Sequence, residues 1–237
     1  MEKNSARFIV IGPGAIVGRE RAVGCMVGWG STLRAPADIE ITSVGVFVIG
    51  AMKDLRDDRL PFLGKALSSV FPTETVRDIY AHLYSKLIVN SCITSLGAVS
   101  GLLLGKMLAR RDCRDFFIQI IREAMDVAKA IGVTVPAYKG QLDYYRFLSG
   151  NGVIPNLRRH IFLRLFGLKY RRLKSSSLQS LERGARTEID YFNGYIERKA
   201  KKTAVSVPMN SRVTSMIKEI EAGKRRIAAE NLSELKK

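Results

Sequence analysis

The sequence predicts a small α/β domain followed by a domain built only from helices, with the boundary near Thr75. Two patterns support this division. In residues 1–75, short apolar runs of strand length are separated by glycine, proline and serine. From residue 76 onward, apolar residues recur three and four positions apart over long stretches, a spacing typical of helices that bury one face. We therefore expect an α/β domain over residues 1–75 and a helical domain over residues 76–237.

The α/β domain should combine short strands with one helix. Strands are expected at residues 7–11, 22–29, 38–41 and 44–49. A helix is expected over residues 57–70, where leucines and a valine are spaced three or four apart. Pro72 should end this helix, because proline has no amide hydrogen and disfavours helix in the residue before it.

The helical domain should contain several long helices. They are expected at residues 76–99, 113–131, 178–201 and 211–235. Gly132 is predicted to end the second of them, because glycine is the usual residue beyond a helix carboxyl terminus. Residues 141–173 contain a glycine-rich break at 149–152, which is followed by a strongly basic, helix-like stretch.

Composition limits the class of protein. The 237 residues carry 39 Lys and Arg against 22 Asp and Glu, a net charge of +17, and 46% of them are hydrophobic. A disordered polycation is excluded, since it lacks the apolar side chains that offset the entropy of ordering. No apolar run reaches the roughly 18 residues of a membrane span, and no signal peptide is expected. The three cysteines lack pairing spacing, which suits a reducing compartment, so we expect a cytoplasmic protein. The net positive charge favours anionic partners.

A glycine-rich turn follows the first expected strand. Gly12 and Gly14 match the first two positions of G-x-G-x-x-G, in which the main chain approaches a pyrophosphate at a helix amino terminus. The third position falls on Val17, and Gly18 comes one place late. Residues 19–21 are too short for the helix of a βαβ unit. A glycine turn without a nucleotide is therefore the alternative, and the pattern alone does not decide between them.

Three polar residues form a stripe on the first long helix. Lys86, Asn90 and Thr94 are spaced four residues apart, while their neighbours are apolar, so the helix should be mostly buried. Burial of a lysine lowers its pKa toward a value useful for proton transfer. The stripe is either a donor array for an anionic or carbonyl ligand or a solvated face of an amphipathic helix.

Two further polar segments lie in the last third of the chain. Ser176 or Ser177 would cap the helix that opens there, the ordinary role of serine before an apolar period. Glu188 and Asp190 lie in a moderately apolar stretch and are either functional or surface acids. The two histidines and three cysteines have no metal-ligand spacing, so no metal site is expected.

The basic stretch from Arg158 to Lys174 accounts for much of the excess charge. Aromatic residues are interleaved with its basic ones, as on some nucleic-acid surfaces. No nucleic-acid motif accompanies them, so a nucleic acid is not the expected partner. The stretch could equally attract a phosphorylated cofactor and a carboxylate substrate, or form a solvated face.

Together these segments resemble ketopantoate reductase, the 2-dehydropantoate 2-reductase family. The matching stretches are KLIVN at 86–90, SSSLQ at 175–179, TEID at 187–190, NG at 193–194 and VPMN at 207–210. Residues 12–16 resemble the family's opening fingerprint, and residues 24–50 resemble later strands of its nucleotide domain. The resemblance implies a truncated Rossmann-like part followed by an all-helical C-terminal domain of the ketopantoate reductase type, used for substrate binding and dimerisation.

The resemblance also implies roles for individual residues. The family's general-acid lysine falls on Lys86, which would protonate the substrate carbonyl oxygen as NADPH delivers a hydride. Substrate-binding positions fall on Asn90, on Thr94, where the family often has a second asparagine, and on Ser176, which would hold the carboxylate. Glu188 would contact the cofactor or the lysine. Cofactor contacts are also implied for the glycine pair of the fingerprint, Gly12 and Gly14.

The sequence departs from the family after Gly18. Residues 19–21 lead directly to Ala22, whereas the family has further βα units at this point. The absence of those units would impair activity. The implied function is NADPH-dependent reduction of 2-dehydropantoate, or a similar 2-oxo acid, to the 2-hydroxy acid in pantothenate biosynthesis, by a homo-oligomer. The alternative is a non-catalytic helical binding or oligomerisation module descended from such a reductase.

Overall fold

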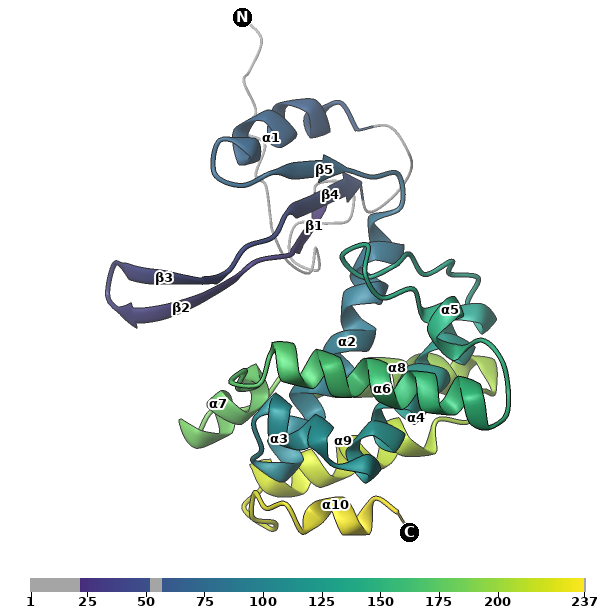
Figure 1. Ribbon diagram of the computed structural model, residues 1–237. Helices are drawn as coiled ribbons and strands as arrows, with labels where there is room; N and C mark the ends of the chain where they lie inside the picture. Colours follow the sequence, from purple (N-terminus) through teal and green to yellow (C-terminus); the bar gives the residue numbers. More distant parts are fainter. Residues whose placement is uncertain (1–21, 52–56, 237) are drawn as a thin grey trace, which may run out of the picture. The chain divides into compact units, whose positions relative to one another are not determined.

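The computed structural model describes residues 22–51 and 57–236 (Figure 1). The chain divides into two compact units, the first ending at Lys86 and the second beginning at Leu87. Helix α2 (Ile79–Ser100) runs through the point of division. The expected strand at 7–11 lies outside the described residues.

A three-stranded sheet forms the centre of the first unit. Its strands are β1 (Val23–Val27), β4 (Phe47–Ala51) and β5 (Thr73–Thr75), in the order β1-β4-β5. Strand β4 pairs antiparallel with β1 and parallel with β5. Strands β2 (Gly30–Ala35) and β3 (Asp38–Ser43) form a separate antiparallel hairpin. The strands expected at 22–29, 38–41 and 44–49 are therefore present, whereas β2 and β5 were not expected.

Each face of the sheet buries its own cluster of apolar side chains. Val23 and Ile49 pack on one face against Leu60 and Leu63 of α1 (Arg59–Ser68). The alternate residues Met26 and Val48 pack on the other face with Ile79, at the start of α2. Successive side chains of a strand point to opposite faces, so one short apolar strand can serve both clusters. The helix expected over 57–70 is confirmed, with ends two residues inside those expected.

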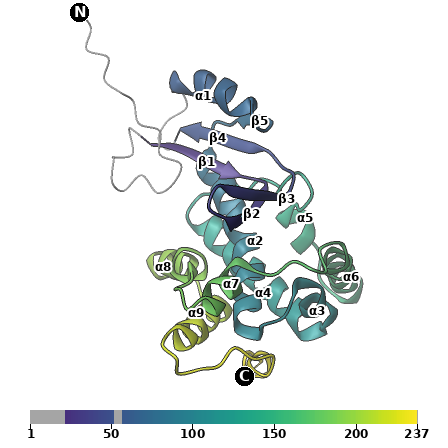
Figure 2. The same ribbon diagram turned by 90° about the vertical axis from the view of Figure 1, so that its left-hand side faces the viewer.

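The second unit is helical. After α2 its elements are α3 (Leu104–Ala109), α4 (Arg111–Ala130), α5 (Tyr144–Leu148), α6 (Val153–Lys169), α7 (Ser176–Glu182), the 3-10 helix η1 (Ile189–Tyr191), α8 (Asn193–Thr203), α9 (Pro208–Glu221) and α10 (Asn231–Glu234). Helix α4 contacts α3, α5, α6, α8 and α9 (Figures 1 and 2). Its residues 113, 116, 117, 120, 121, 124, 127 and 128 are buried, a spacing of three and four that explains its central place. As predicted, α4 ends just before Gly132, which has a φ of 72°.

Two of the expected long helices are broken, so those predictions were wrong. The helix expected over 178–201 is divided into α7, η1 and α8, and Gly184 follows α7 with a φ of 70°. The helix expected over 211–235 ends at Glu221, and Gly223 follows it with a φ of 69°. A positive φ cannot continue a right-handed helix, and glycine adopts it without steric cost.

A buried polar network joins four helices of the second unit. Asn193, at the start of α8, donates to the Ser91 carbonyl at 3.2 Å and to Asn210 Oδ1 at 3.0 Å. The Ser95 hydroxyl donates to Asn193 Oδ1. Asn210 in turn donates through Nδ2 to the Glu123 carboxylate at 2.7 Å. Each of these side chains lies in the core with its polar atoms satisfied, which fixes α2, α4, α8 and α9 against one another.

Candidate functional site

Helix α2 carries the predicted stripe of Lys86, Asn90 and Thr94. Asp78 Oδ1 accepts a hydrogen bond from the Ala81 main-chain nitrogen at 3.0 Å and so satisfies a donor at the helix start. Between the stripe residues the helix is mainly apolar, and Ile88 is fully buried. The buried Ile88 therefore anchors the part of the helix that belongs to the second unit.

Lys86 is half-buried and reaches strand β1 of the first unit. Its Nζ donates to the Val27 carbonyl at 2.8 Å. Its charge also acts on Cys25, two residues earlier on the same strand: burial raises the pKa of the Cys25 thiol, and the nearby Lys86 ammonium opposes that rise. This hydrogen bond to a main-chain carbonyl holds the ammonium beside strand β1.

Thr94 and Ser175 join the stripe to the segment before α7. The Thr94 hydroxyl donates to the Asn90 carbonyl at 2.8 Å, and the Thr94 carbonyl accepts from Ser175 Oγ at 3.3 Å. Gly97 makes this approach possible, because a Cβ at that position would lie 2.6 Å from Ser175 Oγ. Both Thr94 and Ser175 are buried, whereas Asn90 is half-buried.

The cap of α7 is Ser175, not Ser176 or Ser177 as predicted. Ser175 Oγ accepts from the Leu178 main-chain nitrogen at 3.2 Å while donating to α2. Ser176 is the first residue of α7, and its side chain is exposed. The structure therefore brings the Ser175–Ser176 segment beside Thr94, with the buried Ser175 as the contact and Ser176 on the surface.

Glu188 is exposed, and its neighbours fasten the surrounding segment to α9. Thr187 donates through its main-chain nitrogen and its hydroxyl to Glu221 Oε1, both at 2.7 Å. Asp190 Oδ1 lies 2.7 Å from Lys218 Nζ. The Glu188 carbonyl accepts from the Tyr191 nitrogen at 2.9 Å at the start of η1. The segment is thus anchored on both sides of Glu188, and the Glu188 side chain is left on the surface.

The predicted site residues are therefore brought together only in part. Thr94 and the segment that holds Ser176 are in contact, and Lys86 and Asn90 lie along the same helix. The structure describes no contact that joins Glu188 to Thr94 or Ser175. Gly12 and Gly14 lie outside the described residues. The roles that the resemblance implies for all seven remain predictions.

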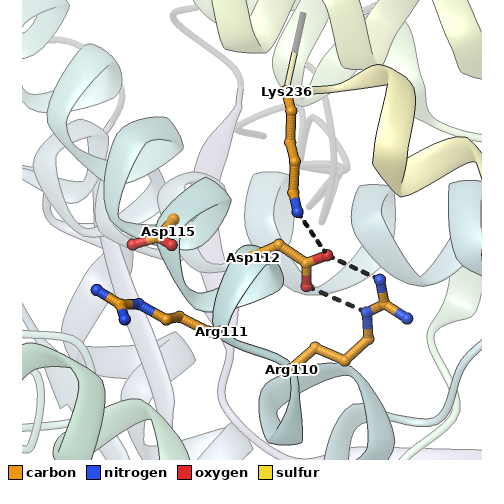
Figure 3. A pocket seen from close by; sticks show the side chains of 5 residues that line it. All are labelled: Arg110, Arg111, Asp112, Asp115 and Lys236. Atoms are coloured by element: carbon orange, nitrogen blue, oxygen red, sulfur yellow. Dashed lines mark hydrogen bonds and ion pairs between the residues drawn. The ribbon is translucent and has the colours of Figure 1, made fainter.

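An open pocket of about 390 Å³ lies elsewhere on the second unit, at the start of α4 (Figure 3). It is lined by Arg110, Arg111, Asp112, Asp115 and Lys236. Asp112 lies between two cations: its carboxylate accepts from Arg110 at 2.7 Å and lies 3.6 Å from Lys236 Nζ (Figure 3). These ion pairs hold the Asp112 pKa below its ordinary value, chiefly through the Arg110 hydrogen bond. Internal pairing satisfies most of the charge here, and the pocket contains no predicted site residue.

Among residues 22–51 and 57–236 no cluster of His, Cys, Asp and Glu could hold a metal ion. No helix in this described part of the chain is both long and apolar enough to cross a membrane.

The hydrogen-bonded network of Glu123, Asn193 and Asn210 was not predicted from the sequence. The resemblance had matched Asn193 and Asn210 as motif residues, but the sequence gives no sign that Glu123 connects to them.

A family model and the curated relatives match this chain. Residues 78–221 match the family model described as "Ketopantoate reductase PanE/ApbA C terminal". The chain is 27% identical over 206 residues to a 2-dehydropantoate 2-reductase of Aquifex aeolicus, covering 86% of this chain and 61% of that relative. The chain thus spans about three fifths of the length of the curated relatives it matches.

Solved structures share the fold. A PanE/ApbA family ketopantoate reductase from Ralstonia eutropha JMP134 superposes with a TM-score of 0.69 at 22% identity, covering 86% of this chain and 61% of that one. A D-mandelate dehydrogenase in complex with NADH superposes with a TM-score of 0.70 at 19% identity, covering 88% and 65%. Since the family model covers more than half of the chain, from the start of α2 to the end of α9, the chain belongs to the ketopantoate reductase PanE/ApbA family.

Proposed function

We propose that this chain supplies the proton donor and the substrate-binding groups of a 2-oxo acid reductase, with 2-dehydropantoate as the substrate and NADPH as the hydride donor. The observation that carries the proposal is the stripe on α2. Lys86 and Asn90 lie one helical turn apart, and Thr94, one turn further, contacts the segment that contains Ser176. A cytoplasmic homo-oligomer is part of the proposal.

The stripe suits the chemistry of carbonyl reduction. When a hydride reaches the carbonyl carbon, negative charge develops on the oxygen, and a positioned acid that protonates it lowers the barrier. The Lys86 ammonium, held by the Val27 carbonyl, would donate that proton. The Asn90 amide would donate to the substrate one turn away, and the exposed Ser176 hydroxyl would bind its carboxylate.

Thr94 contributes less than an asparagine would. Its hydroxyl donates to the Asn90 carbonyl, so only the oxygen lone pairs remain for a ligand. Because that hydrogen bond stays within α2, Thr94 would orient the Asn90 turn and contact substrate as an acceptor. Glu188, whose carboxylate is exposed, would contact the cofactor or Lys86.

The described residues do not fit a dinucleotide by themselves. Pyrophosphate binding in this type of fold needs a glycine-rich turn between a parallel strand and a helix amino terminus. In the described part of the chain, the parallel strand β5 leads to α2 through Val76, Arg77 and Asp78, which include no glycine and place an acid at the helix start. When bound, NADPH would supply only the hydride.

The second candidate is a non-catalytic helical module. It is favoured by the poor fit of the described residues to a dinucleotide, since the described first unit offers a three-stranded sheet and no phosphate cradle. A module of this kind would keep the buried network and the α2 packing but would not bind NADPH.

Calorimetric titration of the purified chain with NADPH separates the two candidates. Binding at micromolar to sub-millimolar concentration supports the reductase, and the absence of heat at millimolar NADPH supports the module. If NADPH binds, its oxidation is then followed at 340 nm with 2-dehydropantoate. We expect Lys86→Ala to abolish turnover and the exposed α3 variant Lys106→Ala to leave it unchanged. Full turnover by Lys86→Ala would remove Lys86 as the acid.

A further inference from the structure

The outer face of α6 is an exposed aliphatic stripe. Its members are five large side chains that are between 50% and 81% exposed: Ile154, Leu157, Ile161, Leu165 and Leu168. They recur at intervals of three and four residues, so they form one row along the helix. Helix α6 lies at the margin of the helical unit, where Figure 2 shows it end-on. We call this row the α6 stripe.

The opposite face of α6 is packed inside the unit. Arg159, His160, Leu163 and Gly167 are buried on α3, α4 and the segment after α5. A Cβ on Gly167 would lie 2.7 Å from the Leu108 Cβ, which shows how closely α6 packs on α3. An ordinary surface helix faces solvent with polar side chains. Helix α6 instead has apolar side chains outward, the composition of a helix that is covered on both sides.

Aromatic residues of this stretch do not face outward in a row. Phe162 and Phe166 are half-buried and stacked at 6.5 Å, and Phe166 lies 4.8 Å from Tyr170. Single-stranded nucleic acids are bound by exposed aromatic rings beside basic groups. The exposed side chains of α6 are aliphatic, so the surface fits a protein better than a nucleic acid.

The spacing of the stripe is symmetric about Ile161. The other four members lie seven and four residues before it and four and seven residues after it. A two-fold interface places each residue of one copy opposite its symmetry mate, so an antiparallel helix pair centred on Ile161 sets Leu157 against Leu165 and Ile154 against Leu168. We propose that the α6 stripe is the interface of a homodimer in which two α6 helices pack antiparallel across a two-fold axis at Ile161.

The apolar area is adequate for such a dimer. The stripe, together with the 83% exposed Val153 beside it, presents on the order of 500 Å² of aliphatic surface per copy, at the upper end of apolar patches on monomers. Pairing two copies would remove on the order of 1,000 Å² from water, the lower limit for a specific interface. Side chains around the stripe would complete the rim.

The charges beside the stripe set the salt dependence of this dimer. Arg158, Arg164 and Lys169 flank the stripe, and no acid occurs between Asp143 and Glu182. In the antiparallel pair each Arg158 lies about 9 Å along the axis from its symmetry mate, because both are three residues from Ile161. Repulsion over that distance is largely screened at physiological ionic strength. Added salt should therefore tighten the dimer, whereas it would weaken binding to an anionic membrane or to an acidic partner.

Light scattering of the full chain after size exclusion tests the interface directly. We expect twice the 26.4 kDa chain mass and a dimer that tightens between 50 and 500 mM NaCl. The double variant Leu157→Glu/Leu165→Glu should weaken dimerisation at least ~100-fold and elute as a monomer. Tyr191→Glu replaces a 68% exposed side chain outside α6 and serves as the matched control that stays dimeric.

Cysteine cross-linking tests the arrangement without disturbing the fold. In a Cys25→Ser background, Ile161→Cys should form an intermolecular disulfide on mild oxidation, because the two copies of residue 161 meet at the axis. Ile154→Cys should not, since its two copies lie about 21 Å apart. Mixed Ile154→Cys and Leu168→Cys chains should cross-link to each other.

Several results would overturn the proposal. They are a monomeric wild-type chain at all salt concentrations, a dimer that survives the double glutamate variant, and efficient self-linking of Ile154→Cys, which requires parallel helices. Sedimentation of the chain with phosphatidylserine vesicles, if lost in the double variant while the wild type stays monomeric, would assign the stripe to a membrane surface instead.

Discussion

Glu123 on α4 caps the amino terminus of α9 through Asn210. Its carboxylate accepts from the main-chain nitrogens of Met209 and Asn210, both at 2.9 Å, and from Asn210 Nδ2 at 2.7 Å. Pro208, the first residue of α9, has no amide hydrogen to satisfy. A buried anion at a helix amino terminus is stabilised by these donors and by the helix dipole. These bonds join the VPMN segment at 207–210 to α4, at the centre of the helical unit. Through Asn210 they also join the NG segment at 193–194 to α4.

Glu123→Gln should lower the free energy of unfolding by about 2 kcal/mol, because the amide group turns a donor toward main-chain donors and removes the charge. Urea unfolding followed by circular dichroism measures this loss. Glu197→Gln, which removes the i,i+4 ion pair of α8 with the exposed Lys201, should change stability by less than about 0.5 kcal/mol. Equal effects of the two variants would contradict the capping role of Glu123.

Arg159 should be essential to the segment between α5 and α6. Its buried guanidinium donates to the carbonyls of Phe147 at 3.0 Å, Leu148 at 2.7 Å and Ser149 at 3.0 Å. Arg159→Met would keep the aliphatic stem but remove the donor that these carbonyls share, at a cost of about 3 kcal/mol. The adjacent Arg158→Met removes an exposed side chain whose hydrogen bonds to the Arg146 and Ser149 carbonyls are open to solvent, and it should cost under about 1 kcal/mol. Thermal unfolding of both variants compares them, and a smaller loss for Arg159→Met would be inconsistent with this assignment.

His160 should make the protein less stable in mild acid. Burial lowers its pKa below the ordinary 6.5, with Asp115 opposing the shift and Arg114 adding to it. Arg114 Nε donates to His160 Nδ1 at 3.2 Å, so that nitrogen is unprotonated in the fold. In the window from pH 6.5 down to the lowered pKa, the unfolded chain binds a proton that the folded chain does not. The free energy of unfolding therefore decreases as the pH is lowered through this window.

Unfolding free energies measured at pH 7.5, 6.5, 5.5 and 5.0 test this dependence. His160→Gln cannot be protonated and should flatten the part of the curve below pH 6.5. His82→Gln, on α2, is the control in which that part of the curve remains. Stability that rises on acidification through this window would show that the sign of the shift is wrong.

Two helical glycines should respond to alanine in opposite directions. At Gly97 of α2 a Cβ would meet Ser175 Oγ at 2.6 Å and Ser175 Cβ at 2.8 Å. Gly97→Ala should therefore displace the α7 cap and destabilise by about 1–3 kcal/mol, despite better helix propensity. At Gly64 of α1 the nearest atom would be 3.6 Å away, so Gly64→Ala should stabilise by up to about 1 kcal/mol. Chemical denaturation of both variants measures the contrast, and a stabilising Gly97→Ala would show that α7 does not press on α2.

Much of the helical unit was predictable from local spacing. The α2 helix, its Lys86–Asn90–Thr94 stripe and the end of α4 before Gly132 follow from three- and four-residue periodicity and from glycine at a helix end. These features depend on residues within one or two turns of each other. The family resemblance also came from the sequence, since its segments are short contiguous motifs, and the comparisons confirm it.

Only the tertiary structure decided which side chains do what within those motifs. The sequence predicted Ser176 or Ser177 as the cap, whereas Ser175 is selected because Thr94, 81 residues earlier, offers it a carbonyl. Glu123 likewise meets Asn210 across 87 residues. Local propensity records what a residue can do within its own helix. The choice among equivalent donors and acceptors is made by burial, where each polar atom must find a partner from whichever segment packs beside it.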